Sequence, residues 1–158
     1  MNVLHMKKFF VLLTVFFVQL FFTQDLASYR KMIPKAEQSE IDALVFLDKS
    51  KTEYDKTKKP IVLSFYAAAQ FFMAKHSSNP LKKYSYFNKG KKMLDEAIGK
   101  EPGNLEMRFL RLLCQEKTPK FLGYYQYMDE DKAFVVREYK KSKDRDLVEQ
   151  IQKYLKDN

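Results

Sequence analysis

The sequence holds few of the residues from which catalytic and metal sites are built. Cys114 is the only cysteine among 158 residues, which excludes an intramolecular disulfide and a cysteine-rich zinc site. His76 is the only histidine after residue 24, so Cys114 and His76 form the one conceivable nucleophile and base pair. Cys114 falls beside an apolar helix stripe, where burial would raise its pKa and leave it inert. We therefore expect no catalytic residue, no metal site and no cofactor.

Glycine and proline are also scarce, with four and five residues respectively. This scarcity argues against a low-complexity or loop-dominated chain, and no glycine-rich phosphate loop occurs. The hydrophobic content of 46% and the aromatic content of 15% are those of a globular protein. A chain of this length allows one domain that buries roughly two thirds of the surface of its unfolded state.

An apolar run follows two lysines at the N-terminus. Lys7 and Lys8 precede residues 9–22, which are apolar except for Thr14 and Gln19, and polar residues return at position 23. The run is too short to span a bilayer and has the length of a signal-peptide core. We predict a signal peptide over residues 1–24, with cleavage uncertain by a few residues and translation starting at Met1 or Met6. Residues 25–158 would form the exported domain, periplasmic or secreted, without stable membrane insertion.

The mature chain has helix patterns throughout and no convincing strand. Ser39 has capping-box spacing before Asp42 and predicts a helix to about Tyr54. The apolar residues at helical intervals that support it are Ile41, Leu44 and Val45. Pro60 suits the first position of a helix that is apolar nearly all round and therefore central and buried. Asn79 begins a third helix, which ends near Gly99. An apolar stripe at spacings of three and four indicates this helix and consists of Leu81, Tyr84, Phe87, Gly90, Leu94, Ala97 and Ile98.

Four further patterns complete the expected fold. Asn104 caps a helix that Thr118 and Pro119 end, and acidic residues 129–131 begin another that runs to about Lys141. Residues 121–127 are rich in aromatics and irregular, and a last helix covers about residues 145–156. The fold class is all-α, with antiparallel helix hairpins.

Residues 87–113 carry a family resemblance. The aromatic, small, large, small, aliphatic and proline positions of a tetratricopeptide-repeat helix appear in order as Phe87, Gly90, Leu94, Ala97, Ile98 and Pro102. The chain thus resembles a short, degenerate tetratricopeptide-like array, in which Gly90 and Ala97 would let a neighbouring helix approach closely. It also resembles exported helical proteins of unassigned function from Gram-negative bacteria, notably in residues 86–92 and 108–111. Neither likeness implies a ligand.

Five residues are candidates for binding. Arg108 and Arg111 share a helix at a spacing of three, lie off its inward apolar face and could bind a carboxylate or phosphate. Tyr124, Tyr125 and Tyr127 could stack on sugars or a partner. Two structural readings compete with these. The arginines would pair with Glu106, Glu116 or residues 129–131 across helices, and at least two tyrosines would pack in the core.

Charge gives a weaker indication of function. The net charge is +9, or +7 without Lys7 and Lys8, but the lysines are spread along helices and export separates the protein from nucleic acid. We therefore expect a non-catalytic scaffold of the cell envelope that docks another envelope protein or peptide between its helix pairs, and no nucleic acid. The alternative is a binding module for an anionic small molecule or envelope glycan.

Overall fold

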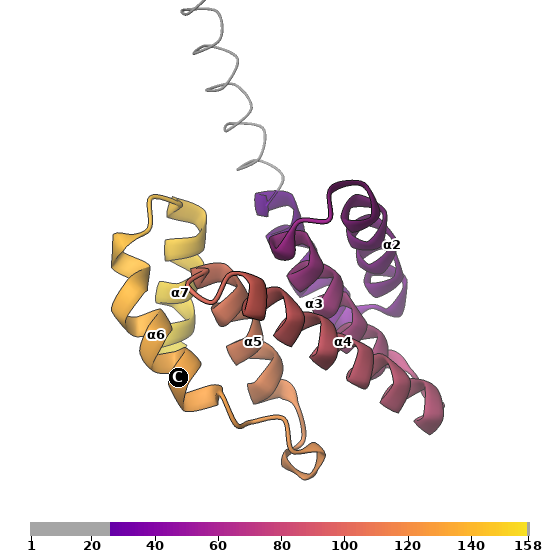
Figure 1. Cartoon of the computed structure of the whole chain (residues 1–158). Coiled ribbons are helices and arrows are strands. Elements are labelled where there is room, and N and C mark those ends of the chain that lie inside the picture. The colour runs from indigo at the N-terminus through magenta and orange to yellow at the C-terminus, as the bar shows by residue number, and fades with distance from the viewer. Residues whose placement is uncertain (1–25, 158) are drawn as a thin grey trace, which may run out of the picture.

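The structure is a computed structural model that describes residues 26–157, and these are helical apart from turns, with no strand among them. Residues 26–38 are helical, and the elements that follow are α2 (Glu40–Thr57), α3 (Pro60–His76), α4 (Pro80–Lys100), α5 (Leu105–Lys117), the 3-10 turn η1 (Lys120–Leu122), α6 (Met128–Glu138), the 3-10 turn η2 (Tyr139–Lys141) and α7 (Arg145–Asp157). The predicted all-α class and the packing in helix pairs are confirmed (Figure 1). The finer likeness to tetratricopeptide repeats stays a prediction, and the predicted signal peptide lies outside the described residues.

Side-chain caps mark where three of the helices, α2, α4 and α5, begin. The Ser39 hydroxyl accepts a hydrogen bond from the backbone N–H of Asp42 at 3.3 Å, and the Asn104 side chain accepts one from Met107 at 3.2 Å. The Asn79 side chain accepts two, from the next two backbone donors of α4 after Pro80. These bonds satisfy amide groups that have no partner within the helix, which is why short polar residues predicted the helix starts correctly.

Several boundaries differ from those predicted. The helix at residues 26–38 was not foreseen, and α2 continues three residues beyond Tyr54 to Thr57. The segment predicted as one helix to Lys141 divides into α6, which ends at Glu138, and the 3-10 turn η2. Within the described residues no helix has the length and apolar character that crossing a membrane requires.

α3 is the centre of the larger core, as predicted. It lies between α2 and α4 and buries eleven of its seventeen residues. The helix at residues 26–38 adds Tyr29, whose ring stacks on Phe65 at 5.0 Å between centroids, and α2 adds Phe46. α4 crosses closely at Gly90, where a Cβ atom would lie 2.9 Å from the Phe71 ring and 3.0 Å from the Ala67 carbonyl oxygen.

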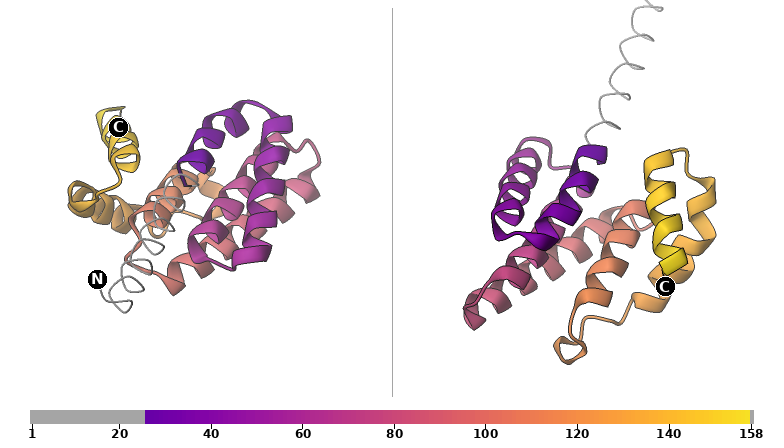
Figure 2. Two further views of the ribbon diagram at one scale, coloured as in Figure 1. Left: turned by 90° about the horizontal axis from the view of Figure 1, so that it is seen from above. Right: turned by 180° about the vertical axis from the view of Figure 1, so that it is seen from behind.

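A smaller core joins α5 to the C-terminal helices. Phe109 and Leu112 of α5 pack against Val135 of α6 and against Leu147 and Ile151 of α7. Figures 1 and 2 show α5 in the middle, with α6 and α7 on one side and the helices up to α4 on the other. Because neighbours cover α5 on both sides, four of its polar residues are buried along with apolar ones, namely Glu106, Arg108, Arg111 and Gln115.

Candidate functional site

Arg108 and Arg111 lie in a buried ion-pair network between α5 and α6. Arg111 donates to both carboxylate oxygens of Asp131, with its Nε at 2.6 Å and its Nη2 at 2.9 Å. The Arg108 Nε lies 2.9 Å from the same carboxylate, and Gln115 donates to it at 3.2 Å. Asp131 is fully buried, and Arg108 and Arg111 are 8% and 4% exposed. The expectation that both arginines lie off the inward face was wrong, because α5 is covered on two sides.

Outer contacts complete this network. Arg108 reaches Glu130 at 2.7 Å, and Arg111 lies 3.4 Å from Asp95 with its guanidinium carbon 4.2 Å from the centre of the Tyr127 ring. Burial alone would lower the pKa of Arg111, but the hydrogen bond and charge of Asp131 raise it. The arrangement is the pairing with residues 129–131 that the sequence also allowed. It fixes α6 on α5, since removing one buried partner would strand the others.

The three candidate tyrosines are separated by their environments. Tyr124 is 1% exposed, stacks on Phe71 at 5.8 Å and donates to Asp95 at 3.3 Å. Burial is the main cause of the raised pKa of the Tyr124 hydroxyl, and the nearby Asp95 carboxylate raises this pKa further. Tyr125 and Tyr127 are exposed, but Tyr127 covers the Arg111 guanidinium. The five candidates therefore form no common open cleft.

A second buried ion cluster was not predicted. Arg30 is 3% exposed and donates to three carboxylates, those of Glu106, Asp144 and Asp146. The contacts measure 2.5 Å, 2.6 Å and 2.8 Å and join the helix at residues 26–38 to α5 and to the start of α7. Desolvation is the largest influence on the pKa of Glu106 and raises it, although Arg30 opposes this. The cluster ties the two cores together.

Cys114 and His76, the candidate nucleophile and base, share no hydrogen bond within the described residues. Burial raises the pKa of the half-buried Cys114 thiol to about 12, so it is protonated at neutral pH. The His76 Nε2 lies 2.8 Å from the Ala36 carbonyl oxygen, which links the ends of α3 and the helix at residues 26–38. Within residues 26–157 no group of three or more histidine, cysteine, aspartate or glutamate side chains is arranged to hold a metal ion.

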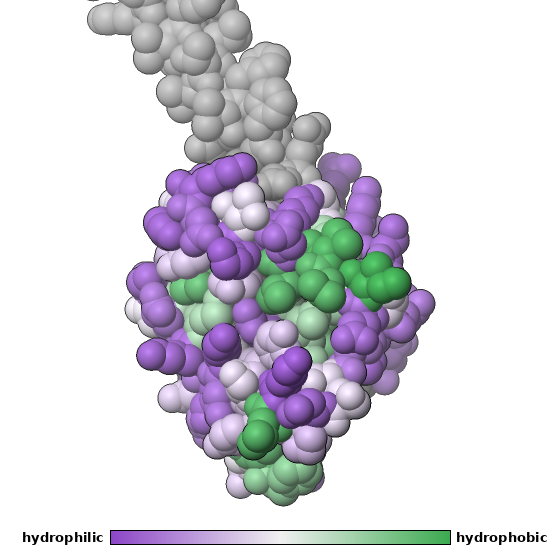
Figure 3. All heavy atoms as spheres, turned by 90° about the vertical axis from the view of Figure 1, so that its right-hand side faces the viewer, coloured by the Kyte–Doolittle hydropathy of each residue, from purple (hydrophilic) through white to green (hydrophobic). Residues whose placement is uncertain are grey.

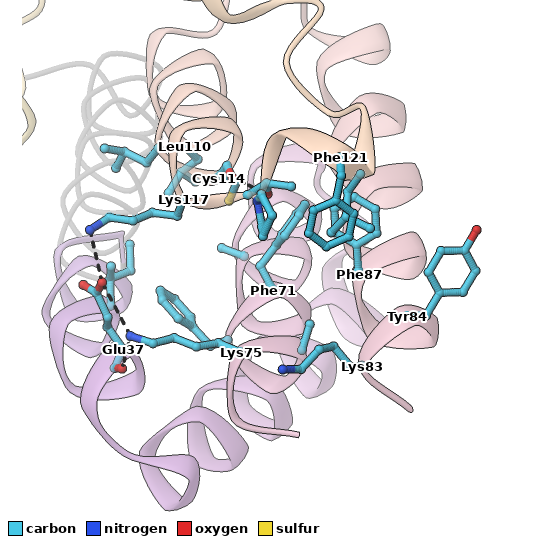
Figure 4. A pocket seen from close by; sticks show the side chains of 18 of the residues that line it. Glu37, Phe71, Lys75, Lys83, Tyr84, Phe87, Leu110, Cys114, Lys117 and Phe121 are labelled. Atoms are coloured by element: carbon cyan, nitrogen blue, oxygen red, sulfur yellow. Dashed lines mark hydrogen bonds and ion pairs between the residues drawn. The ribbon is translucent and has the colours of Figure 1, made fainter. Parts of the chain in front are cut away.

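An apolar groove of about 690 Å³ lies at one end of the larger core (Figure 4). Its walls come from the helix at residues 26–38, from α3, α4 and α5, and from η1. Phe71 and Ala74 of α3, Phe87 of α4 and Leu110 of α5 line it with hydrophobic surface. The volume is within the range of binding sites in proteins, and the lining is mostly hydrophobic as in such sites.

The rim of this groove exposes large hydrophobic side chains. Phe121 of η1 and Tyr84 of α4 line the groove and are 86% and 58% exposed, and Leu81, beside the lining residue Pro80, is 82% exposed. Leu81 and Tyr84 belong to the apolar stripe that predicted α4. Only the later part of that stripe, from Phe87 onward, is buried. The apolar stripe therefore extends beyond the part of α4 that packs against other helices. This extension is the feature of the sequence that corresponds to the exposed rim.

A smaller hydrophobic patch lies on α2. Ile41, Leu44 and Val45, which helped to indicate this helix, are 77%, 50% and 54% exposed, whereas Ala43 and Phe46 face the core. Figure 3 looks onto the side of the molecule that carries α2 and shows hydrophobic side chains gathered in a patch there. The patch is shallow, so the groove is the better candidate for a binding site.

Comparison with known proteins identifies no relative. No protein-family model, no curated protein and no solved structure matches this chain.

Proposed function

We propose that this chain is an exported, non-catalytic interaction domain of the cell envelope that binds an apolar segment of another protein in its groove. The observation that carries the proposal is the open apolar groove with exposed Phe121, Tyr84 and Leu81 at its rim. Contiguous apolar surface that stays exposed in a folded domain commonly marks an interaction site.

The exposed rim favours a protein segment over a small ligand. Small-molecule sites usually enclose most of their ligand, and a small ligand held inside the groove would leave Phe121 and Leu81 in water. A longer segment would cover them as well. The anionic-ligand alternative rested on lysines, on exposed tyrosines and on Arg108 or Arg111. Both arginines are bound to acidic residues of α6 within the domain, which removes its only arginine ligands. For this reason we prefer the protein partner.

The chemistry of the polar groups supports a non-catalytic role. Cys114 is held as a thiol, and the most buried carboxylate, that of Asp131, is bound by two arginines. A nucleophile needs a base within reach, and the Nε2 atom of His76 is engaged with the backbone carbonyl of Ala36. Export is proposed from the N-terminal sequence pattern alone.

Position-specific photocrosslinking in the cells that make the protein tests this proposal. The photoreactive residue benzoylphenylalanine replaces Phe121 or Tyr84 at the rim, or Val136 on α6 as a control that is similarly exposed at 49%. We expect one protein to be captured from both rim positions and not from Val136. Equal capture from all three positions, or none from the rim, would contradict the proposal.

The same material tests export. Mass spectrometry of this chain, recovered from the same cells, should find an N-terminus near residue 25, because the predicted signal peptide has been removed. An intact N-terminal segment would contradict the export part of the proposal and leave the groove part standing.

A further inference from the structure

The interior of the groove offers an occupant few hydrogen-bonding partners. The polar lining side chains other than Tyr84, Thr118 and the thiol of Cys114 are charged, and the Thr118 hydroxyl already donates to the Cys114 carbonyl at 2.7 Å. The Tyr84 hydroxyl points away from the groove in Figure 4. The walls are helices, whose backbone groups are largely paired within each helix, so no strand edge is available. A segment that enters must satisfy its own backbone, as a helix does.

The charged lining residues have a positive balance. Lys75, Lys83 and Lys117 face a single carboxylate, that of Glu37. All three lysines are exposed, so the groove has an apolar interior and a basic rim. Within the described residues Lys83 forms no ion pair, and it is therefore available to a carboxylate of the occupant.

Glu37 lies between two of these lysines. Its Oε1 is 3.4 Å from the Lys117 Nζ and 3.7 Å from the Lys75 Nζ, and Lys75 also donates to the Glu37 carbonyl oxygen at 2.7 Å (Figure 4). Both ion pairs are long, and the side chains are between 39% and 74% exposed, so they are weak. A partner's carboxylate can replace such a contact at little cost.

We propose that the groove binds an acidic amphipathic helix of the partner protein. In the free domain Glu37 occupies the position that a carboxylate of this helix takes in the complex. Large apolar residues on one face of that helix fill the groove beside Phe71 and cover Phe121. Acidic residues at its flanks pair with Lys83, Lys117 and Lys75. This inference rests on the proposed function and adds the chemistry and conformation of the bound segment.

A phage library of random 16-residue peptides, selected on the protein purified as cells process it, supplies the probe. The strongest selected peptide is then synthesised with its acidic residues intact and with each replaced by lysine. Binding is measured by fluorescence anisotropy for the natural protein and for the variants Glu37→Gln and Glu149→Gln. Glu149 is exposed on α7, so its variant makes the same change in net charge away from the groove.

We expect the selected peptides to be acidic, to carry apolar residues three and four positions apart, and to become helical on binding. Glu37→Gln should tighten binding of the acidic peptide about three- to tenfold, since it removes a competing carboxylate, whereas Glu149→Gln should change it less than twofold. Lys83→Glu with Lys117→Glu should weaken it at least tenfold and favour the lysine peptide. High salt should reduce all of these differences.

The remaining outcomes separate the two proposals. Selected peptides that need Phe121 but have no acidic bias, or that respond equally to Glu37→Gln and Glu149→Gln, would overturn this inference and leave the proposed function intact. Peptides that bind in an extended conformation would contradict the inference that the bound segment is a helix. If Phe121→Asp weakens no selected peptide, or if palmitate binds the groove at micromolar concentration while peptides do not, both proposals fail.

Discussion

Gly90 allows a sharp test of how the larger core is packed. A Cβ atom at this position would lie 2.9 Å from two atoms of the Phe71 ring and 3.0 Å from the Ala67 carbonyl oxygen. The backbone oxygen belongs to α3 and cannot move alone. The ring is held by an edge contact with Phe87 and by stacking on Tyr124, each with 5.8 Å between centroids. Gly90→Ala therefore overpacks a region that has little room to adjust.

The magnitude follows from two opposing effects. Alanine in a helix interior is worth about 1 kcal/mol over glycine. Overpacking costs about 1–3 kcal/mol, and contact with a backbone oxygen that cannot move alone places Gly90→Ala in the upper part of that range, at about 2–3 kcal/mol. We expect Gly90→Ala to lower the free energy of unfolding by about 1–2 kcal/mol. Gly99→Ala is the matched control, because Gly99 lies in the same helix with nothing within 4 Å of its Cβ position. It should raise stability by about 0.5–1 kcal/mol.

Urea unfolding followed by circular dichroism at 222 nm measures both variants. We expect the urea midpoints to move in opposite directions, with a total difference in the free energy of unfolding of roughly 1.5–3 kcal/mol between Gly90→Ala and Gly99→Ala. If Gly90→Ala stabilises the protein as much as Gly99→Ala does, the close approach of α4 to α3 at this position is refuted.

Three further predictions concern polar groups that are buried or half-buried. Asp131→Ala should lower the free energy of unfolding by about 3–5 kcal/mol, because it leaves the buried guanidinium of Arg111 without its carboxylate. Replacing both residues by apolar ones should lower it less than the single change does, and thermal unfolding measures both variants. Because its pKa is raised to about 12, the Cys114 thiol should react with iodoacetamide at pH 8 at least about 100-fold more slowly in the folded than in the unfolded chain. Rates within about tenfold of each other would contradict the raised pKa. Burial alone would raise the pKa of Asp144, but hydrogen bonds from Arg30 and the backbone lower it overall. The ionised Asp144 carboxylate should therefore stabilise the fold at pH values above its ordinary pKa, and this contribution should be lost as the pH falls through the lowered pKa. In Asp144→Asn the free energy of unfolding should change less with pH in that range.

The sequence predicted the features that depend on near neighbours. The caps at Ser39, Asn79 and Asn104 involve atoms two or three residues apart, so their spacing alone indicated where α2, α4 and α5 begin. The burial of α3 followed from its apolar residues on all faces. In these segments local preference and tertiary packing favour the same structure.

Features that join distant segments could not be predicted. The partners of Arg30 lie 76 to 116 residues away, and no pattern near Arg30 indicates them. Arg108 and Arg111 were expected away from the core because a helix stripe shows one buried face, whereas two sets of helices cover α5. On α2 the apolar stripe that indicated the helix is the exposed one. Periodicity identifies a helix but does not state which face a neighbour covers.

The groove is the intermediate case. Leu81 and Tyr84 were visible in the sequence as the start of the α4 stripe, yet only the structure shows that the stripe extends past the buried part of the helix. Phe121 comes from a segment too irregular to place in advance.

The most direct test of the central claim is a pair of matched substitutions at exposed hydrophobic residues. Phe121→Asp at the rim and Val136→Asp on α6 both introduce one negative charge at a position outside the cores, so neither should affect folding. Calorimetry then measures the affinity for the partner captured by photocrosslinking. We predict that Phe121→Asp weakens binding at least about tenfold, as expected for an aromatic anchor, and that Val136→Asp changes it less than twofold. Equal affinities for the two variants would contradict binding in the groove.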